Sequence, residues 1–248
     1  MDKIERQIKS VEYALNVLEV LGEVDGNFRL ARLSEKLNMN KSLVYRILTT
    51  FERRGYVEKV KSSKEYRLGL GAYEVGQKFL SRMELLHLSK PVMEGLVREC
   101  DETVYLALPT GLEILFLEKI DTSNPVSTIP LVGKRYFLFK CAAGKITLSF
   151  DAVLRRRFTE EESSFSVENM DDLREQGFCH DYDILGEGVA SLAVPLLNEA
   201  KKVVASLCLV GPQYRFTDEK IHNEFLPALK AAGQILSCRL GYLGYYLS

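Results

Sequence analysis

The sequence predicts an α+β protein in which an N-terminal winged helix-turn-helix precedes a larger domain built on an antiparallel sheet. Three observations support this. Residues 11–54 repeat apolar side chains at helical spacing three times, and residues 56–68 alternate like two short strands. Residues 103–210 then contain strand-like segments, with helical segments before and after them. A chain of 248 residues is long enough for two buried cores.

The first two helices follow from apolar spacing. The segment Val11–Leu21 has apolar residues three and four positions apart, with Ser10 as the expected N-cap and Gly22 near the end. A second short helix is expected over 30–37, where leucines recur on one face. Both are amphipathic, so each is expected to bury one side in a common core.

A third helix is expected from about 41 to 54, after a short polar break at 38–40, and Gly55 supplies its stop. Two helices joined by a tight turn are typical of a helix-turn-helix. The alternating segments 56–60 and 65–68 predict a hairpin directly after the third helix. A hairpin in this position, with a basic, serine-rich tip, is a wing.

The start of the third helix carries hydrogen-bonding side chains opposite its apolar stripe. The N-terminal part of such a helix enters the major groove, where base edges present donors and acceptors. Arg46 is the best candidate for a two-pronged base contact. The predicted DNA-binding residues are Asn40, Lys41, Ser42, Tyr45, Arg46 and Thr49 on the helix and Lys61, Ser62, Ser63 and Lys64 at the wing tip.

The distribution of charge agrees with a nucleic-acid partner for the first domain only. Residues 1–72 contain 14 Lys and Arg against 10 Asp and Glu, and the rest of the chain contains 19 against 24. Duplex DNA is therefore the expected partner. The alternative is a ligand-sensing module that acts through protein partners and uses its winged helix for association.

The second domain begins with helical spacing and continues with strands. We expect the domain boundaries 1–69 for the winged helix, 70–86 for a linker helix and 87–248 for the second domain. The expected elements of the second domain are a helix over 91–100, strands over 103–108, 114–120, 188–196 and 203–210, and a final helix from 218 to about 241 with Ile221, Phe225, Leu229 and Ile235 on one side.

No pattern in the second domain predicts catalysis. Gly144-Lys145 fails as a phosphate loop because Phe139 stands where the partner glycine is needed and Ile146 replaces the Ser or Thr. The histidines have no metal-ligand spacing. His180 and Asp181 could form an acid–base pair, but a hydrogen-bonded loop histidine is the preferred interpretation. We expect no enzymatic activity, no metal and no cofactor.

The remaining composition describes an ordinary globular protein. The five cysteines are scattered and never form a CxxC pair, so we interpret them as reduced core residues. No apolar run approaches the roughly 20 residues of a membrane span, and the charged start is not a signal peptide. The expected location is the cytoplasm, with no membrane partner.

Short motifs along nearly the whole chain resemble the IclR family of bacterial transcriptional regulators. In the first domain these are Ser10–Leu15, Leu33–Leu37, Lys41–Leu48, Arg54–Val57 and Tyr66–Gly69. In the second they are Glu102–Ala107, Val132–Arg135, Ala143–Lys145, Gly177–Asp181, Gly188–Val189, Ala193–Pro195, Gly211–Pro212 and Arg215–Thr217. The resemblance implies a GAF-like effector domain, a homodimer or tetramer reading a two-fold-related operator, and signal transfer through the 70–86 helix.

The resemblance also implies where a small-molecule effector binds. The family's ligand positions, with the apolar residues expected around them, correspond here to Leu138, Phe139, Ala142, Ala143, Asp181, Val189, Ser191, Cys208 and Val210, and Ile146, Leu154 and Leu192 are expected nearby. Cys208 and Val210 stand where relatives that bind small carboxylates use hydroxyl donors. A buried carboxylate lacking two donors is poorly satisfied, so we expect an aromatic or largely apolar effector. The alternative is that these apolar residues are simply core.

Overall fold

The computed structural model describes residues 8–23, 27–126, 128, 130–161 and 170–244. The chain folds as two compact units, Met1–Met83 and Glu84–Ser248. Each unit has its own hydrophobic core, one around Val44 and Leu48 and the other around Tyr105 and Phe116.

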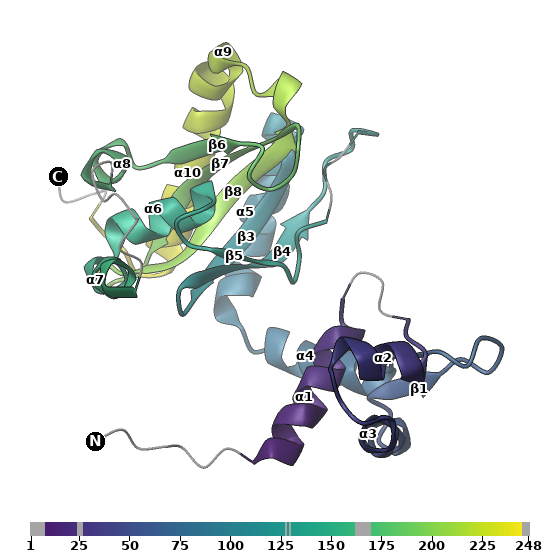
Figure 1. Ribbon diagram of the computed structural model, residues 1–248. Coiled ribbons are helices and arrows are strands. Elements are labelled where there is room, and N and C mark those ends of the chain that lie inside the picture. The colour runs from purple at the N-terminus through teal and green to yellow at the C-terminus, as the bar shows by residue number, and fades with distance from the viewer. Residues whose placement is uncertain (1–7, 24–26, 127, 129, 162–169, 245–248) are drawn as a thin grey trace. The chain divides into compact units, whose positions relative to one another are not determined.

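The N-terminal unit contains the predicted helices and wing (Figure 1). Its elements are α1 (Lys9–Leu21), α2 (Leu30–Lys36), α3 (Lys41–Arg53), β1 (Val57–Lys59), β2 (Tyr66–Leu68) and α4 (Leu70–Leu80). One detail of the prediction is wrong: Ser10 is not the N-cap of α1, because the helix already starts at Lys9 and Ile8 occupies the cap without a side-chain hydrogen bond.

The wing is fixed to the helices by backbone contacts. β1 and β2 pair antiparallel, and Phe28 forms an isolated bridge to Tyr66. Gly55 follows the C-cap of α3 and has a φ of +75°. This is a left-handed backbone conformation, which glycine adopts without strain. A Cβ on Gly69 would lie 2.4 Å from the carbonyl oxygen of Gly55, so the chain entering α4 packs directly on the end of α3.

The C-terminal unit is built on a six-stranded antiparallel sheet in the order β5-β4-β3-β8-β7-β6. Its elements are α5 (Glu84–Cys100), β3 (Thr103–Thr110), β4 (Glu113–Ile120), β5 (Arg135–Phe137), α6 (Ala142–Phe150), α7 (Ala152–Glu161), α8 (Met170–Gln176), β6 (Cys179–Tyr182), β7 (Val189–Leu197), β8 (Val203–Pro212), a 3₁₀ turn (Gln213–Arg215), α9 (Asp218–Lys220), a π-helix (Ile221–Phe225) and α10 (Leu226–Arg239).

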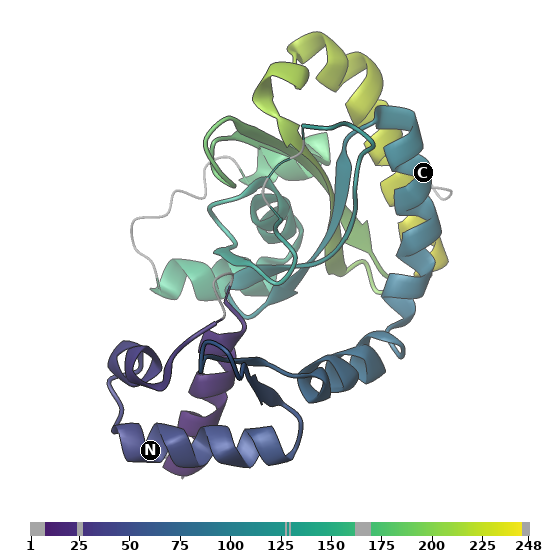
Figure 2. The same ribbon diagram turned by 90° about the vertical axis from the view of Figure 1, so that its right-hand side faces the viewer.

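Helices cover both faces of this sheet. α5 and α10 pack against each other, α5 on β3 and β4 and α10 on β7, and Figure 2 shows them side by side along the sheet. α6 crosses the other face, where it contacts β6, β7 and β8, and α8 packs against α6. The α+β class and the antiparallel sheet are therefore confirmed.

Two predicted helices differ from the observed ones. The helix expected over 70–86 is interrupted: α4 ends at Leu80 and α5 begins at Glu84, with a turn at residues 81–83. The final helix is divided into α9, a π-helical stretch and α10. Its residue Ile235 is 48% exposed, and Leu236 takes the buried position instead.

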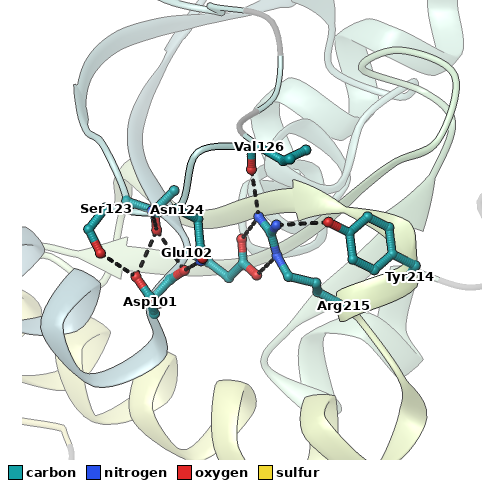
Figure 3. Close-up of polar contacts among 8 residues, drawn as sticks. Asp101, Glu102, Ser123, Asn124, Val126, Tyr214 and Arg215 are labelled. Carbon is teal, nitrogen blue, oxygen red and sulfur yellow. Dashed lines mark hydrogen bonds and ion pairs between the residues drawn. The ribbon is translucent and has the colours of Figure 1, made fainter.

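A buried ion pair holds together three segments of the C-terminal unit (Figure 3). Glu102, 2% exposed at the start of β3, accepts hydrogen bonds from Arg215, one of them 2.8 Å long. The same guanidinium donates to the carbonyl oxygen of Val126 at 3.1 Å. Beside it, the Asp101 carboxylate accepts hydrogen bonds from the hydroxyls of Thr122 and Ser123, which anchor the chain after β4.

Candidate DNA-binding surface and effector site

The N-terminus of α3 is fixed by its own cap. Asn40 is the N-cap, and its Oδ1 accepts hydrogen bonds from the backbone N–H of Ser42 at 2.9 Å and from the Ser42 hydroxyl at 2.8 Å. Such a cap satisfies a backbone donor that the first turn would otherwise leave unpaired. The structure therefore gives Asn40 a structural role that the sequence analysis did not assign to it.

The polar face of α3 points away from the core of its unit. Lys41, Ser42, Tyr45 and Arg46 are exposed, and the structure gives the Arg46 guanidinium no ion pair or hydrogen bond within the described residues. Thr49 is half-buried, and its hydroxyl donates to the carbonyl oxygen of Tyr45 at 2.9 Å. The free donors are therefore concentrated in the first two turns of the helix.

The wing tip and α3 border one open groove. Lys61, Ser62 and Lys64 are exposed, and Lys64 has a positive φ of 58° in the turn between β1 and β2. Ser63 has a buried hydroxyl without a hydrogen-bond partner in the part of the chain that is described. The groove is lined by Arg29, Leu30, Ala31, Lys41, Tyr45, Lys59, Ser62, Ser63, Lys64 and Tyr66.

Two basic residues of this groove were missed from the sequence. Arg29 precedes the first residue of α2, and Lys59 ends β1 with its Nζ 5.2 Å from the centre of the Tyr66 ring. A hydrogen bond with the Tyr66 hydroxyl raises the pKa of Lys59, which stays positive. Alternation along 57–61 gave no signal for Lys59, because it puts this residue on the same strand face as the buried Val57, and Arg29 gave no pattern either.

The predicted effector residues come together on the sheet face that α6 covers. Asp181 of β6 lies opposite Ser191 of β7, which lies opposite Val210 of β8. The neighbouring row contains Cys179, Ala193 and Cys208, each two positions from the first row in its own strand. Side chains two positions apart share a face of a sheet. The further members Leu138, Phe139, Ala142, Ala143, Ile146, Leu154 and Val189 belong to or pack against the same core cluster.

Asp181 holds the N-terminus of α6. Its Oδ2 accepts a hydrogen bond from the backbone N–H of Ala142, and its Oδ1 accepts one of 2.5 Å from the Ser191 hydroxyl. Burial raises the pKa of Asp181, while the Ser191 bond, the charge of Lys145 and the Ala142 N–H lower it. The carboxyl group is thus partly satisfied by the protein itself.

Three thiols surround this carboxyl group. Burial raises the pKa of Cys141 and of Cys179 to about 12, and raises that of Cys208 well above its ordinary value. All three are therefore neutral thiols at neutral pH, which are poor nucleophiles and weak hydrogen-bond donors. The predicted effector site is thus a mainly apolar part of the core, with the carboxyl group of Asp181 and the hydroxyl of Ser191 as neighbouring polar groups.

Two expectations for this region are wrong. Leu192 faces the other side of the sheet, because it lies between Ser191 and Ala193 in β7. His180 and Asp181 are neighbours in β6, so their side chains point to opposite faces and form no acid–base pair. His180 is exposed in a strand rather than a loop, and it packs between the rings of Phe178 and Tyr182.

Gly144 has a packing role. A Cβ at this position would lie 2.1 Å from the carbonyl oxygen of Leu138, which is backbone and cannot rotate away. The glycine therefore lets α6 lie directly on the segment that precedes it. Ser206 adds to this contact, because its hydroxyl donates to the carbonyl oxygen of Ala143 at 2.9 Å.

Comparisons with known proteins match both units. The model for the IclR helix-turn-helix domain matches residues 10–61, and the model for the bacterial transcriptional regulator IclR C-terminal matches residues 77–238. The chain is 29% identical to the HTH-type transcriptional regulator KdgR of Escherichia coli over 258 aligned positions, covering 99% of this chain and 97% of KdgR.

Solved structures share the fold. An IclR transcriptional regulator from Alicyclobacillus acidocaldarius superposes with a TM-score of 0.82 at 22% identity, over 94% of this chain and 98% of that one. An IclR homologue from Microbacterium hydrocarbonoxydans, complexed with 4-hydroxybenzoate, has a TM-score of 0.74 at 20% identity, over 94% and 99% of the two chains. Within the described residues, no helix is long and apolar enough to span a membrane.

The family models together cover most of the chain, and the chain matches HTH-type transcriptional regulators over nearly their whole length, 97% of KdgR and 98% of XynR of Escherichia coli. The resemblance inferred from short motifs is thereby confirmed. The protein belongs to the IclR family of bacterial transcriptional regulators.

Proposed function

We propose that this regulator reads its operator with Lys41, Ser42, Tyr45 and Arg46 of α3, and holds the DNA backbone with the basic groove between α3 and the wing. The groove carries the proposal, because Arg29, Lys41, Lys59 and Lys64 line it from three different elements. Four cations along one concave surface favour a polyanion. The polar first turns of α3 then face the base edges.

Lys64→Ala is expected to weaken binding to all duplexes by a similar factor, because a wing-tip lysine contacts phosphate and carries no sequence information. The slope of log affinity against log salt should become shallower by about 1. Fluorescence anisotropy over a series of salt concentrations measures both quantities. Lys90→Ala, an exposed lysine of α5, is the control. An unchanged slope for Lys64→Ala would remove the wing tip from the interface.

We infer that two copies of the N-terminal unit associate through exposed apolar side chains on α1 and α4. Ile8, Val11 and Leu15 lie on one face of α1 and are each more than half exposed. On α4, Tyr73 and Phe79 are 63% and 61% exposed. Exposed apolar side chains that gather on one helix are candidates for interaction sites. A dimer would present two α3 helices to a two-fold-related operator, and a tetramer would double that arrangement.

Leu15→Glu is expected to shift the protein toward the 28.1 kDa monomer, because the carboxylate would be buried without a partner at the proposed interface. Sedimentation equilibrium measures the mass directly. Glu19→Gln, a change on the same helix that adds no charge, should leave the assembly intact. If Leu15→Glu kept the wild-type mass, the α1 surface would not be the dimer contact.

We propose that the predicted effector site beside α6 binds a small aromatic or largely apolar effector that donates one hydrogen bond to Asp181. The Asp181 oxygens accept one hydrogen bond each from the protein, and a carboxylate has room for more. Around it, Cys208 and Val210 offer no strong donor to a ligand carboxylate. The related structure complexed with 4-hydroxybenzoate supports the inference that this fold accommodates an aromatic ring.

A thermal-shift panel tests the effector class. Phenols and aromatic acids are expected to raise Tm by roughly 5–10 °C at a hundredfold excess over Kd, and glyoxylate and pyruvate should have no effect. Ser191→Ala and Asp181→Asn should each reduce the shift. Tight binding of glyoxylate or pyruvate, with the aromatic compounds inert, would contradict the proposal.

The effector signal is proposed to pass along the chain between the two units. Residues 70–80 form α4 in the first unit, and α5 in the second begins at Glu84. Only three residues separate these helices, so a change at the start of α5 reaches α4 through a short turn. Half-sites spaced by about 34 Å or a multiple make affinity sensitive to small changes in the position of the two heads.

A further inference from the structure

The C-terminal unit has a cavity that is separate from the predicted effector site. It has a volume of about 240 Å³ and lies where the far end of β7, the C-terminal end of α8 and one face of α10 meet. Its lining residues are Phe150, Arg174, Gln176, Gly177, Val194, Pro195, Leu197, Lys230, Gly233, Gln234 and Tyr242. None of these belongs to the predicted effector residues, so the cavity is a distinct candidate site.

The cavity exists because β6 is shorter than β7. β6 pairs with β7 only as far as Cys179 opposite Ala193, so the stretch of β7 from Val194 to Leu197 has no β6 residue beside it. Gly233 brings α10 close to this stretch: a Cβ there would lie 2.9 Å from Cγ2 of Val194. The floor is therefore apolar and closely packed, while the edge of the sheet stays open.

Two cationic side chains line this cavity, and none of its described lining residues is acidic. Arg174 of α8 is exposed, and the one partner that the described residues give its guanidinium is the Phe150 ring, 5.9 Å away. Lys230 of α10 donates to the carbonyl oxygen of Gln176 at 2.8 Å and lies 5.1 Å from the centre of the Phe178 ring. Neither cation has a carboxylate partner in the part of the chain described.

The two cations and the apolar walls together indicate which class of ligand the cavity can bind. A guanidinium and an ammonium group together favour an anion, which the guanidinium can bind through two parallel hydrogen bonds. The walls formed by Phe150, Val194 and Leu197 favour an apolar body rather than a bare inorganic ion. The volume is below the roughly 300–1,000 Å³ of pockets for drug-sized ligands, so the ligand is small.

We propose that this cavity is a second small-molecule site, which binds a small organic anion with an apolar body between Arg174 and Lys230. It lies at the opposite end of α6 from the predicted effector site, since Phe150 ends that helix and Ala142 begins it. At 1.5 Å per residue the two ends are about 12 Å apart. The two sites therefore share no lining residue and lie at opposite ends of one helix.

¹⁹F NMR with 4-fluorobenzoate and the full chain tests the proposal. The probe has no hydrogen-bond donor for Asp181, so it should bind in a component that is displaced by benzoate but not by benzyl alcohol or inorganic phosphate. Arg174→Gln/Lys230→Gln should weaken that component at least tenfold. Ser191→Ala should leave it unchanged, because Ser191 pairs with Asp181 in the predicted effector site and does not line this cavity. Arg98→Gln/Lys90→Gln, which removes two exposed cations of α5, is the matched control.

Circular dichroism shows whether the double variant is folded, and Arg174→Gln alone is a second test because Arg174 is exposed. Wild-type affinity in a folded Arg174→Gln/Lys230→Gln variant would overturn the proposal. Equal binding of a neutral probe, 4-fluorobenzyl alcohol, would also overturn it, as would a single binding component abolished by Ser191→Ala. None of these results bears on whether a ligand at the predicted effector site regulates DNA binding.

Discussion

Arg215→Leu is expected to destabilise the C-terminal unit by about 3–5 kcal/mol, because it leaves the Glu102 carboxylate buried without its partner. It also removes the hydrogen bond to the carbonyl oxygen of Val126. For a unit of this size the loss corresponds to a decrease in Tm of roughly 10 °C. Differential scanning calorimetry measures the change, and urea unfolding gives the free energy.

A double variant separates the ion pair from simple loss of packing. Glu102→Leu/Arg215→Leu removes both charges, so it should be markedly more stable than Arg215→Leu alone. Arg135→Leu is the matched control, since its ion pair with Glu113 is 3.5 Å long and exposed, and such pairs contribute about 0–1 kcal/mol. If Arg215→Leu lowered the free energy of unfolding no more than Arg135→Leu does, the buried ion pair would not stabilise the unit as proposed.

Arg46→Ala is expected to weaken operator binding by about 1–3 kcal/mol and to relax the sequence preference at one base pair. Arg46 lies on the exposed face of the first two turns of α3. The full chain first selects duplexes from a random pool. Anisotropy titrations with the selected duplex and its single-base variants then measure affinity and preference together.

Arg98→Ala, at an exposed arginine of α5, serves as the control for this measurement. The pattern of loss distinguishes base reading from backbone contact. A uniform loss across all single-base variants would place Arg46 on phosphate, and unchanged affinity would remove Arg46 from the interface altogether.

The N-terminal unit could be predicted almost completely from the sequence. Its helices each bury one face and expose the other, so apolar spacing locates α1, α2 and α3 to within one or two residues. The wing followed from alternation, with Val57 and Tyr66 buried. What spacing could not show was the first cap, because the end of a helix depends on local hydrogen bonds.

The C-terminal unit was predicted less well, and α6 shows why. Ala142–Phe150 is buried on nearly every side, so it has no polar face and no helical alternation. Its small residues Ala142, Ala143 and Gly144 let the helix pack closely against the sheet and Leu138. The spacing of apolar residues along the sequence does not reveal such close packing. The strand Cys179–Tyr182 is short and carries inward-facing Asp181, so it too lacks an apolar pattern.

The candidate effector residues came from the family resemblance, and the contacts among them came from the structure. The sequence placed Asp181 near the ligand but could not show that its carboxylate caps α6 and pairs with Ser191. Ile235 was assigned to the buried face of the last helix, but seven residues after Leu229 is Leu236, which completes two turns and is buried. In a helix, an error of one residue turns the predicted face by about 100°, so a different side chain faces the core.

The salt dependence of duplex binding by the full chain tests most directly whether the winged helix binds DNA through α3 and the groove beside the wing. With a selected duplex, affinity should fall steeply between 50 and 200 mM salt, with a log–log slope of about −0.9 for each phosphate neutralised. The selected sequences should also show two-fold symmetry. Failure to select any duplex, or an affinity independent of salt, would contradict the account.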